Sequence, residues 1–218
     1  MIIKDKIINF LGDSITQGIG ASNENNGYVA VLCEKYGLKR ANNYGVSGTR
    51  IARRSVLRPC ETEDLHFSTR IDRMDPEADI IVVFGGTNDY GHGDALLGDF
   101  YDRTEDTFYG ACHHLFLRLL DKFPGKPIIV LTPMHRADEN DVTYKGPENQ
   151  PTRLIDYVNI IREVAQYYSL PVCDLWANLG ICPVVESNRE TFCPDGCHPN
   201  DVGHALLAER VGNFLLHL

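Results

Sequence analysis

No run of basic residues and no long apolar stretch occurs in this 218-residue chain. A helix that crosses a membrane needs about 18 or more apolar residues in succession. The formal net charge is −9, from 21 Lys and Arg against 30 Asp and Glu. An acidic chain without a basic patch has no means of neutralising the phosphates of nucleic acids or anionic lipids. We therefore expect neither nucleic acid nor a membrane as a partner.

The chain also lacks the marks of secretion. Residues 1–6 show no charged segment followed by an apolar stretch and a cleavage site, as a signal peptide would. The seven cysteines are odd in number and scattered, which is untypical of a disulfide framework. We therefore expect reduced thiols and a cytoplasmic location. The cysteines are Cys33, Cys60, Cys112, Cys173, Cys182, Cys193 and Cys197.

No internal repeat, low-complexity segment or Pro- or Ser-rich linker marks a domain boundary. With 43% hydrophobic and 23% charged residues, the chain has the composition of a globular protein. Its length suits one continuous core. We therefore expect a single domain over residues 1–218, and nothing in the sequence specifies an oligomeric state.

Short apolar runs predict five β-strands. The run Ile80–Phe84 is apolar at every position, as in parallel strands that are covered on both faces. Such runs are separated by longer segments with helical periodicity, so the connections are long enough for parallel pairing. The candidate strands are Ile7–Leu11, Ala41–Tyr44, Ile80–Phe84, Ile128–Leu131 and Val172–Leu175.

Three segments show apolar residues at the spacings of three and four that give a helix one apolar face. Asn200 is the expected N-cap of the last helix. Alternation of strands and helices indicates an α/β fold, a doubly wound parallel sheet with helices on both faces. Ligands of such sheets bind beyond the carboxyl ends of the strands. The apolar stripes are Phe108, Cys112, Leu115, Leu119 and Phe123; Leu154, Val158, Ile161, Ala165 and Tyr168; and Leu207, Val211 and Phe214.

Four short motifs carry residues suited to acyl transfer. A serine hydroxyl attacks an ester only when a base takes its proton and a third group orients that base. Ser14 follows the first strand directly, whereas Asp195 and His198 lie close together far downstream. Ser14 is therefore the candidate nucleophile, His198 the candidate base and Asp195 the group that orients it. The motifs are Gly12-Asp13-Ser14, Asn43-Tyr44-Gly45-Val46-Ser47-Gly48-Thr49, Gly85-Gly86-Thr87-Asn88-Asp89 and Asp195-Gly196-Cys197-His198-Pro199-Asn200.

The same motifs offer donors for an oxyanion. Attack on an ester carbonyl places negative charge on its oxygen, and fixed hydrogen-bond donors stabilise that charge. The candidates are the backbone N–H groups of Ser14 and Gly48 and the side-chain amide of Asn88. Carboxylates at Asp13 and Asp89 are expected to hold the loops that carry Ser14 and Asn88.

Taken together, the motifs resemble those of the SGNH hydrolases, the GDSL esterase and lipase family. The resemblance covers most of the chain, with GDS, N-x-G-x-S-G, G-G-x-N-D and D-x-x-H-P-N in the family's order. It implies a flavodoxin-like three-layer α/β/α sandwich with a parallel sheet of about five strands. It also implies that Ser14, Asp195 and His198 form a catalytic triad, that Gly48 and Asn88 complete the oxyanion hole, and that hydrolysis needs no metal or organic cofactor.

Two positions depart from the family's pattern. Ile15 stands where leucine is usual, and Cys197 stands where an aliphatic residue is commoner. Neither position has one of the catalytic roles. The group Cys193, Cys197 and His198 suggests zinc, but no second pair of ligands has the spacing of a zinc site. We therefore expect no metal.

The substrate is expected to be a small-molecule ester. His92, His135 and Arg136 lie on loops at the catalytic end of the sheet and are candidates for the substrate pocket. The polar loop 17–27 follows Ser14, and no basic amphipathic helix is present to dock on lipid. These features favour a serine esterase for short-chain acyl, chiefly acetyl, esters of small polar or carbohydrate alcohols. A lysophospholipase or thioesterase, and a non-catalytic binding module on the same fold, are the alternatives.

Overall fold

The computed structural model describes residues 2–57 and 64–218, so the expectation for Cys60 lies outside the described residues. Its centre is a five-stranded sheet with the order β2-β1-β3-β4-β5. Every neighbouring pair of strands is parallel. The strands are β1 (Ile7–Gly12), β2 (Arg40–Gly45), β3 (Ile80–Phe84), β4 (Ile128–Leu131) and β5 (Val172–Cys173).

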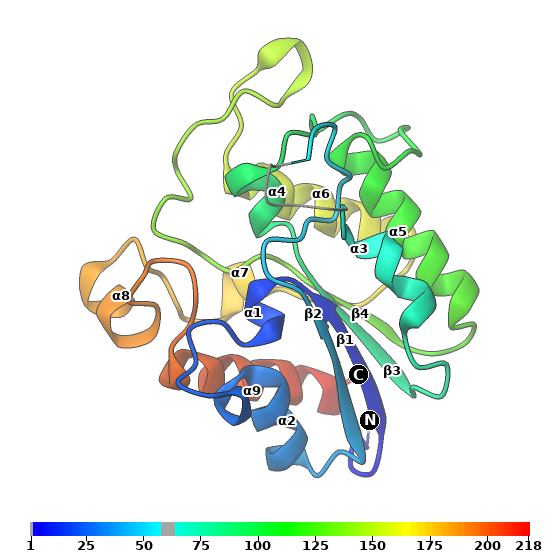
Figure 1. Cartoon of the computed structure of the whole chain (residues 1–218), viewed down its shortest axis with the longest axis vertical. Coiled ribbons are helices and arrows are strands. Elements are labelled where there is room, and N and C mark those ends of the chain that lie inside the picture. Colours follow the sequence, from blue (N-terminus) through cyan, green and yellow to red (C-terminus); the bar gives the residue numbers. More distant parts are fainter. Residues whose placement is uncertain (1, 58–63) are drawn as a thin grey trace.

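Helices cover both faces of this sheet (Figure 1). On one face α2 and α9 pack against alternate residues of β1 and β3, such as Phe10 and Val82. On the other face α3, α5 and α6 pack against Leu11 and Val83. The predicted three-layer α/β/α sandwich is therefore confirmed. The helices are α1 (Ser14–Gln17), α2 (Tyr28–Tyr36), α3 (Phe67–Arg70), α4 (Thr87–His92), α5 (Phe108–Lys122), α6 (Leu154–Tyr167), α7 (Leu175–Asn178), α8 (Glu186–Phe192) and α9 (Asp201–Leu216).

The fifth strand is shorter than predicted. It ends at Cys173, because the side chain of Asp174 accepts a hydrogen bond from Ala177 N and caps α7. Leu175 is therefore the first residue of a helix. A carboxylate at this position satisfies a backbone N–H that the first turn of a helix leaves without a partner.

The helix stripes are mostly as predicted, with deviations at their C-terminal ends. Asn200 caps α9 through a hydrogen bond from Gly203 N, as expected. Leu215, and not Phe214, is the fully buried residue of its last turn. Tyr168 lies just beyond α6 and is only half-buried, because the helix ends at Tyr167.

The strand order explains where a site can form. The chain leaves β1 toward β2 on one side, whereas β3 lies on the other side of β1, so loops diverge at the carboxyl ends of β1 and β3. Ligands of doubly wound sheets bind at such a switch point. Ser14 follows β1 and Asn88 follows β3, so both lie at this point. None of the helices in the described part of the chain has the length and apolar character needed to cross a membrane.

Candidate active site

Ser14 is the first residue of the short helix α1 and follows a tight turn after β1. The Asp13 side chain accepts a hydrogen bond from Ile15 N at 3.0 Å and so caps α1. Gly12 is required here, because a Cβ atom at this position would lie 2.0 Å from Thr16 Oγ1 and 2.8 Å from the Phe84 carbonyl oxygen. The turn holds the Ser14 side chain at the carboxyl end of the parallel strands, where the residue is 4% exposed.

Two hydrogen bonds connect Ser14 to His198 and Asp195. His198 Nε2 lies 2.9 Å from Ser14 Oγ, and His198 Nδ1 lies 2.7 Å from Asp195 Oδ2. A carboxylate only accepts hydrogen bonds, so Nδ1 carries the proton and Nε2 is left to accept from the Ser14 hydroxyl. The residues that the sequence placed in the triad therefore meet in the geometry that a serine nucleophile requires.

Asp195 is held by the backbone of its own turn. Its Oδ1 accepts from the N–H groups of Cys197 at 2.8 Å and of His198 at 2.7 Å. Burial alone would raise the pKa of Asp195, but these hydrogen bonds, together with His198, keep the pKa below its ordinary value. The carboxylate is therefore ionised at neutral pH and faces the imidazole with a fixed charge.

The loop after β2 brings Gly48 to Ser14. Val46 N donates to the Gly12 carbonyl oxygen at 3.1 Å, and Thr49 N closes a turn onto the Val46 carbonyl oxygen at 3.3 Å. Gly48 is the third residue of this turn and has φ +76, a conformation that such turns need and that glycine adopts without strain. The hydrogen bond that closes this turn is donated by Thr49 N, so it does not use the Gly48 N–H.

Asn88 is the third candidate donor. It lies in the first turn of α4 and is 8% exposed. Its Nδ2 donates to the Thr49 carbonyl oxygen at 2.9 Å, which fixes the amide plane. An amide nitrogen carries two hydrogens, and this contact uses one of them. Ser14, Gly48 and Asn88 line one common cavity.

That cavity has a volume of about 290 Å³. His92 and Arg136, two of the predicted pocket residues, lie on its wall. Arg136 Nη1 approaches Thr87 O and Thr87 Oγ1 at 3.2 Å each, and its other nitrogens bind Asp138. The lining residues are Ser14, Ser47, Gly48, Asn88, Gly91, His92, Arg136, Cys197 and His198.

His135, the third predicted pocket residue, is not among the described residues that line this cavity. Its ring packs against Trp176 with a centroid separation of 3.9 Å, and its Nδ1 lies 2.7 Å from Glu139 Oε2. Arg136 is turned toward Thr87 instead. The two residues are neighbours in the chain, and only Arg136 reaches the cavity.

Comparison with known proteins identifies the family of this chain. The sequence model of the GDSL-like lipase/acylhydrolase family matches residues 10–206, which include all four motifs. The chain belongs to this family. Family membership supports an ester hydrolase. Among proteins with curated descriptions, none matches the chain.

Solved structures support the same fold for this GDSL-like protein. A protein from Lactobacillus plantarum is 28% identical, with a TM-score of 0.82 over 99% of this chain and 98% of that one. A lipase/acylhydrolase from Enterococcus faecalis is 21% identical, with a TM-score of 0.65 over 96% and 95% of the two chains. An acetyl xylan esterase is 19% identical, with a TM-score of 0.66 over 96% and 99%.

The sequence did not assign Ser47, Gly91 or Cys197 to the pocket, although all three line the cavity. Cys197 is adjacent to His198, and this adjacency is the sequence feature that could have placed Cys197 in the pocket. Burial raises the pKa of its thiol to about 11. A Cβ atom at Gly91 would lie 2.9 Å from Arg136 Nη1, so glycine at this position gives the guanidinium its place. That requirement has no signature in the sequence.

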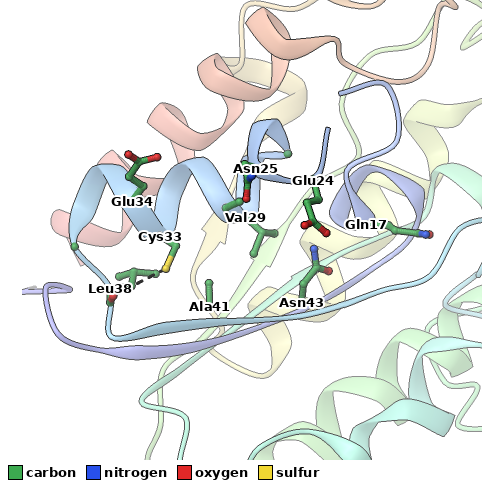
Figure 2. Close-up of a pocket in the computed structure, with 12 residues that line it drawn as sticks. Gln17, Glu24, Asn25, Val29, Cys33, Glu34, Leu38, Ala41 and Asn43 are labelled. Carbon is green, nitrogen blue, oxygen red and sulfur yellow. Dashed lines mark hydrogen bonds between the residues drawn. The ribbon is translucent and has the colours of Figure 1, made fainter. Parts of the chain in front are cut away.

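A second, larger cavity of about 750 Å³ lies away from this site, between α2 and the edge strand β2. Figure 2 shows Val29 and Cys33 on α2 opposite Ala41 on β2, with Glu24 near Asn43 at one end. Neither Ser14 nor His198 lines it. Size alone therefore does not identify the active site, because the reactive groups meet in the smaller cavity. The described residues contain no group of His, Cys, Asp and Glu side chains that could hold a metal ion.

Two buried carboxylates support the site. Burial raises the pKa of Asp13 to about 7 and that of Asp89 to about 6. Asp13 holds the turn of Ser14, as expected. Asp89 has a wider role than expected, because its oxygens accept from Ile51 N at 3.0 Å and Ala52 N at 2.8 Å. It therefore fixes the segment that follows Gly48.

The raised pKa of Asp13 predicts that the free energy of unfolding depends on pH. Its pKa is about 7 in the folded protein against an ordinary value of 3.8, so the folded protein holds a proton that the unfolded chain releases. The stability from this group is fully present below about pH 4 and is lost as the pH rises toward about 7, by at most about 1.4 kcal/mol per pH unit. Asp13→Asn keeps the oxygen that caps α1 and removes the titration.

Urea unfolding measured between about pH 5 and pH 8 tests this prediction. The free energy of unfolding of Asp13→Asn should fall less over this interval than that of the wild-type protein. The exposed substitution Asp121→Asn is the control and should keep the wild-type slope. Parallel pH profiles for wild type and Asp13→Asn would show that Asp13 does not titrate in this range.

Proposed function

We propose that this protein is a serine esterase that hydrolyses carboxylic esters through an acyl-enzyme intermediate. The observation that carries the proposal is the chain of two hydrogen bonds from Ser14 Oγ to His198 Nε2 and from His198 Nδ1 to Asp195 Oδ2. This chain lies at a cavity whose wall also holds Gly48 and Asn88. A binding module has no need of an oriented imidazole on a serine hydroxyl.

The first half of the reaction forms the acyl-enzyme. His198 Nε2 takes the proton of Ser14 as Oγ attacks the ester carbonyl carbon, and the imidazolium is stabilised by Asp195. The resulting oxyanion accepts hydrogen bonds from the Ser14 and Gly48 N–H groups and from the Asn88 amide. When the intermediate collapses, the C–O bond to the alcohol breaks, and His198 gives its proton to the leaving alkoxide.

The second half returns the free enzyme. Water enters the place of the alcohol and loses a proton to His198 Nε2 as its oxygen attacks the acyl carbon. Collapse of the second tetrahedral intermediate breaks the bond to Ser14 Oγ, which regains the proton from His198. The products are one carboxylic acid and one alcohol. In this mechanism every proton transfer uses His198, and no cofactor takes part.

The size and lining of the cavity favour a short acyl group. Its volume of about 290 Å³ is at the lower end of the range for small-molecule sites. The side chains on its wall are small or polar, with Ser47, His92 and Arg136 beyond the triad. Hydroxyl groups on the alcohol part of a substrate can form hydrogen bonds with such a wall. We therefore assign acetyl or similar esters of small polar or carbohydrate alcohols as the substrate class.

Hydrolysis of p-nitrophenyl esters from acetate to palmitate tests both parts of the proposal. The ratio kcat/KM is expected to be highest for acetate or butyrate, because a longer acyl chain would extend beyond the cavity. Ser14→Ala should hydrolyse none of the esters. A maximum at long chains would overturn the substrate class and favour a lysophospholipase or thioesterase. No Ser14-dependent hydrolysis of any ester would contradict the esterase and favour a binding module.

A further inference from the structure

Arg70 has no role in the mechanism, yet it contacts the segments that carry the oxyanion donors. It is the last residue of α3 and is 4% exposed. Its Nη1 donates to the Gly12 carbonyl oxygen at 2.8 Å and also to the Tyr44 carbonyl oxygen. Its Nη2 donates to Thr49 Oγ1 at 2.9 Å. One guanidinium therefore bridges the end of β1, the end of β2 and the loop beyond.

These acceptors lie on both sides of the proposed donors. Gly12 precedes Ser14 by two residues, and Tyr44 and Thr49 bracket Gly48. The Gly12 carbonyl oxygen also accepts from Val46 N at 3.1 Å. Thr49 Oγ1 donates in turn to the Val46 carbonyl oxygen at 2.7 Å. Arg70 thus closes a ring of hydrogen bonds that joins the Gly12 carbonyl oxygen, two residues before Ser14, to the turn that holds Gly48.

Arg70 also reaches the third loop through Phe67. Its guanidinium carbon lies 4.8 Å from the centre of the Phe67 ring. The ring packs on Gly85, where a Cβ atom would lie 2.5 Å from it. Gly85 opens the loop that leads to Asn88. The position of Phe67 therefore links Arg70 to the loop of the third donor.

The chemistry of arginine suits this task. Burial lowers the pKa of Arg70 to about 10, so the side chain stays charged at neutral pH. A guanidinium presents its donors in a rigid plane, whereas the single ammonium of lysine does not span separate acceptors with fixed geometry. Hydrogen bonds from a charged donor are stronger than neutral ones. Arg70 is therefore able to fix the spacing of the segments it joins.

We propose that Arg70 is a positioning residue that sets the distance between the Ser14 and Gly48 N–H groups of the oxyanion hole. The inference rests on the proposed esterase function. Stabilisation of an oxyanion depends on donors that are already in place when the charge develops. Loss of Arg70 should therefore weaken transition-state stabilisation and leave the binding of the ester nearly unchanged.

Kinetics of Arg70→Met with p-nitrophenyl acetate test the proposal. We expect kcat to fall by about 10–100-fold with KM changed by less than about threefold, since part of the oxyanion stabilisation is lost. Arg118→Met is the matched control. Arg118 donates to the carbonyl oxygen of Ser68, which is also on α3, and binds Asp72. It therefore supports the same helix through contacts other than those that Arg70 makes. Its kcat should stay near the wild-type value.

A double-mutant cycle with Asn88→Ala separates positioning from a general loss of stability. If Arg70 acts through the oxyanion hole, Arg70→Met and Asn88→Ala remove parts of the same stabilisation. The kcat of the double variant should then be at least about tenfold higher than the product of the two single losses gives. Multiplicative losses would overturn the proposal. A folded Arg70→Met with wild-type kcat would overturn it as well. Circular dichroism melting shows whether each variant is folded.

If Arg70→Met does not fold, Thr49→Val tests the positioning role of Arg70 instead. This substitution keeps the shape of the side chain and removes the hydroxyl that accepts from Arg70 and donates to the Val46 carbonyl oxygen, so it opens the ring of hydrogen bonds while Arg70 stays in place. It should lower kcat by about three- to tenfold and again be less than multiplicative with Asn88→Ala. Wild-type kcat in folded Thr49→Val would contradict the inference. Failure of the esterase function itself is distinguished by wild-type protein without Ser14-dependent turnover, which would remove both proposals.

Discussion

Replacing Ser14 with alanine is expected to lower kcat for p-nitrophenyl acetate by about 10⁴–10⁶-fold. In the proposed mechanism the Ser14 hydroxyl forms the covalent bond, and His198 Nε2 lies 2.9 Å from its oxygen. Without this oxygen only the oxyanion donors and the cavity remain, and these act on a direct attack by water. The fold should be intact, because the turn depends on Gly12 and Asp13.

The matched variant is Ser47→Ala, which removes the other serine hydroxyl of the same cavity. The backbone N–H of Ser47 donates to Gln17 Oε1 at 2.7 Å, and this contact does not need the hydroxyl. We expect Ser47→Ala to keep more than about a tenth of the wild-type kcat, within the range of a side chain that contacts substrate only. Equal losses in the two variants would show that Ser14 is not the distinct nucleophile.

Replacing His198 with alanine is expected to lower kcat nearly as much as Ser14→Ala, by about 10⁴–10⁶-fold, because nucleophile and base act as one unit. His198 lies between the Ser14 hydroxyl and the Asp195 carboxylate, and each proton transfer of the mechanism uses its Nε2. The Ser14→Ala/His198→Ala double variant should be no slower than either single variant. The measurement is steady-state hydrolysis of p-nitrophenyl acetate.

The control for this prediction is His217→Ala, at the exposed C-terminal end of α9. It should leave the rate unchanged. Substantial turnover in folded His198→Ala would mean that another group takes the Ser14 proton. Multiplicative losses in the double variant would mean that the two residues act in separate steps.

Much of the site was predictable because its key residues lie in short contiguous motifs. Ser14 follows an apolar strand directly, and Asp195 and His198 share one turn, so local spacing already limits their geometry. The strands β3 and β4 were likewise correct to the residue, since both are fully buried and every position is apolar. Periodic burial leaves a clear trace in the sequence.

Residues that act across long separations in the chain were not predictable. Arg70 bridges Gly12, Tyr44 and Thr49, but no spacing in the sequence relates an arginine to three distant acceptors. Asp89 accepts from Ile51 and Ala52 for the same reason without a local signal. His135 and Arg136 are equivalent candidates by position, and only the packing of His135 on Trp176 separates them.

The ends of helices and strands are also hard to predict from the sequence. Asp174 stops β5 because its carboxylate caps α7, so a polar residue inside an apolar run decides the boundary. The apolar pattern alone continues through Leu175 and gives no reason to stop. Capping by side chains competes with strand extension, and the outcome depends on whether the next turn can be buried.

Labelling with a fluorophosphonate probe, followed by peptide mass spectrometry, tests the central claim most directly. Such a probe reacts only with an activated serine. We expect a single stoichiometric adduct on Ser14 in the wild-type protein and none in His198→Ala. Absence of an adduct on folded wild-type protein, or an adduct on another residue, would contradict the claim that Ser14 is the nucleophile of this site.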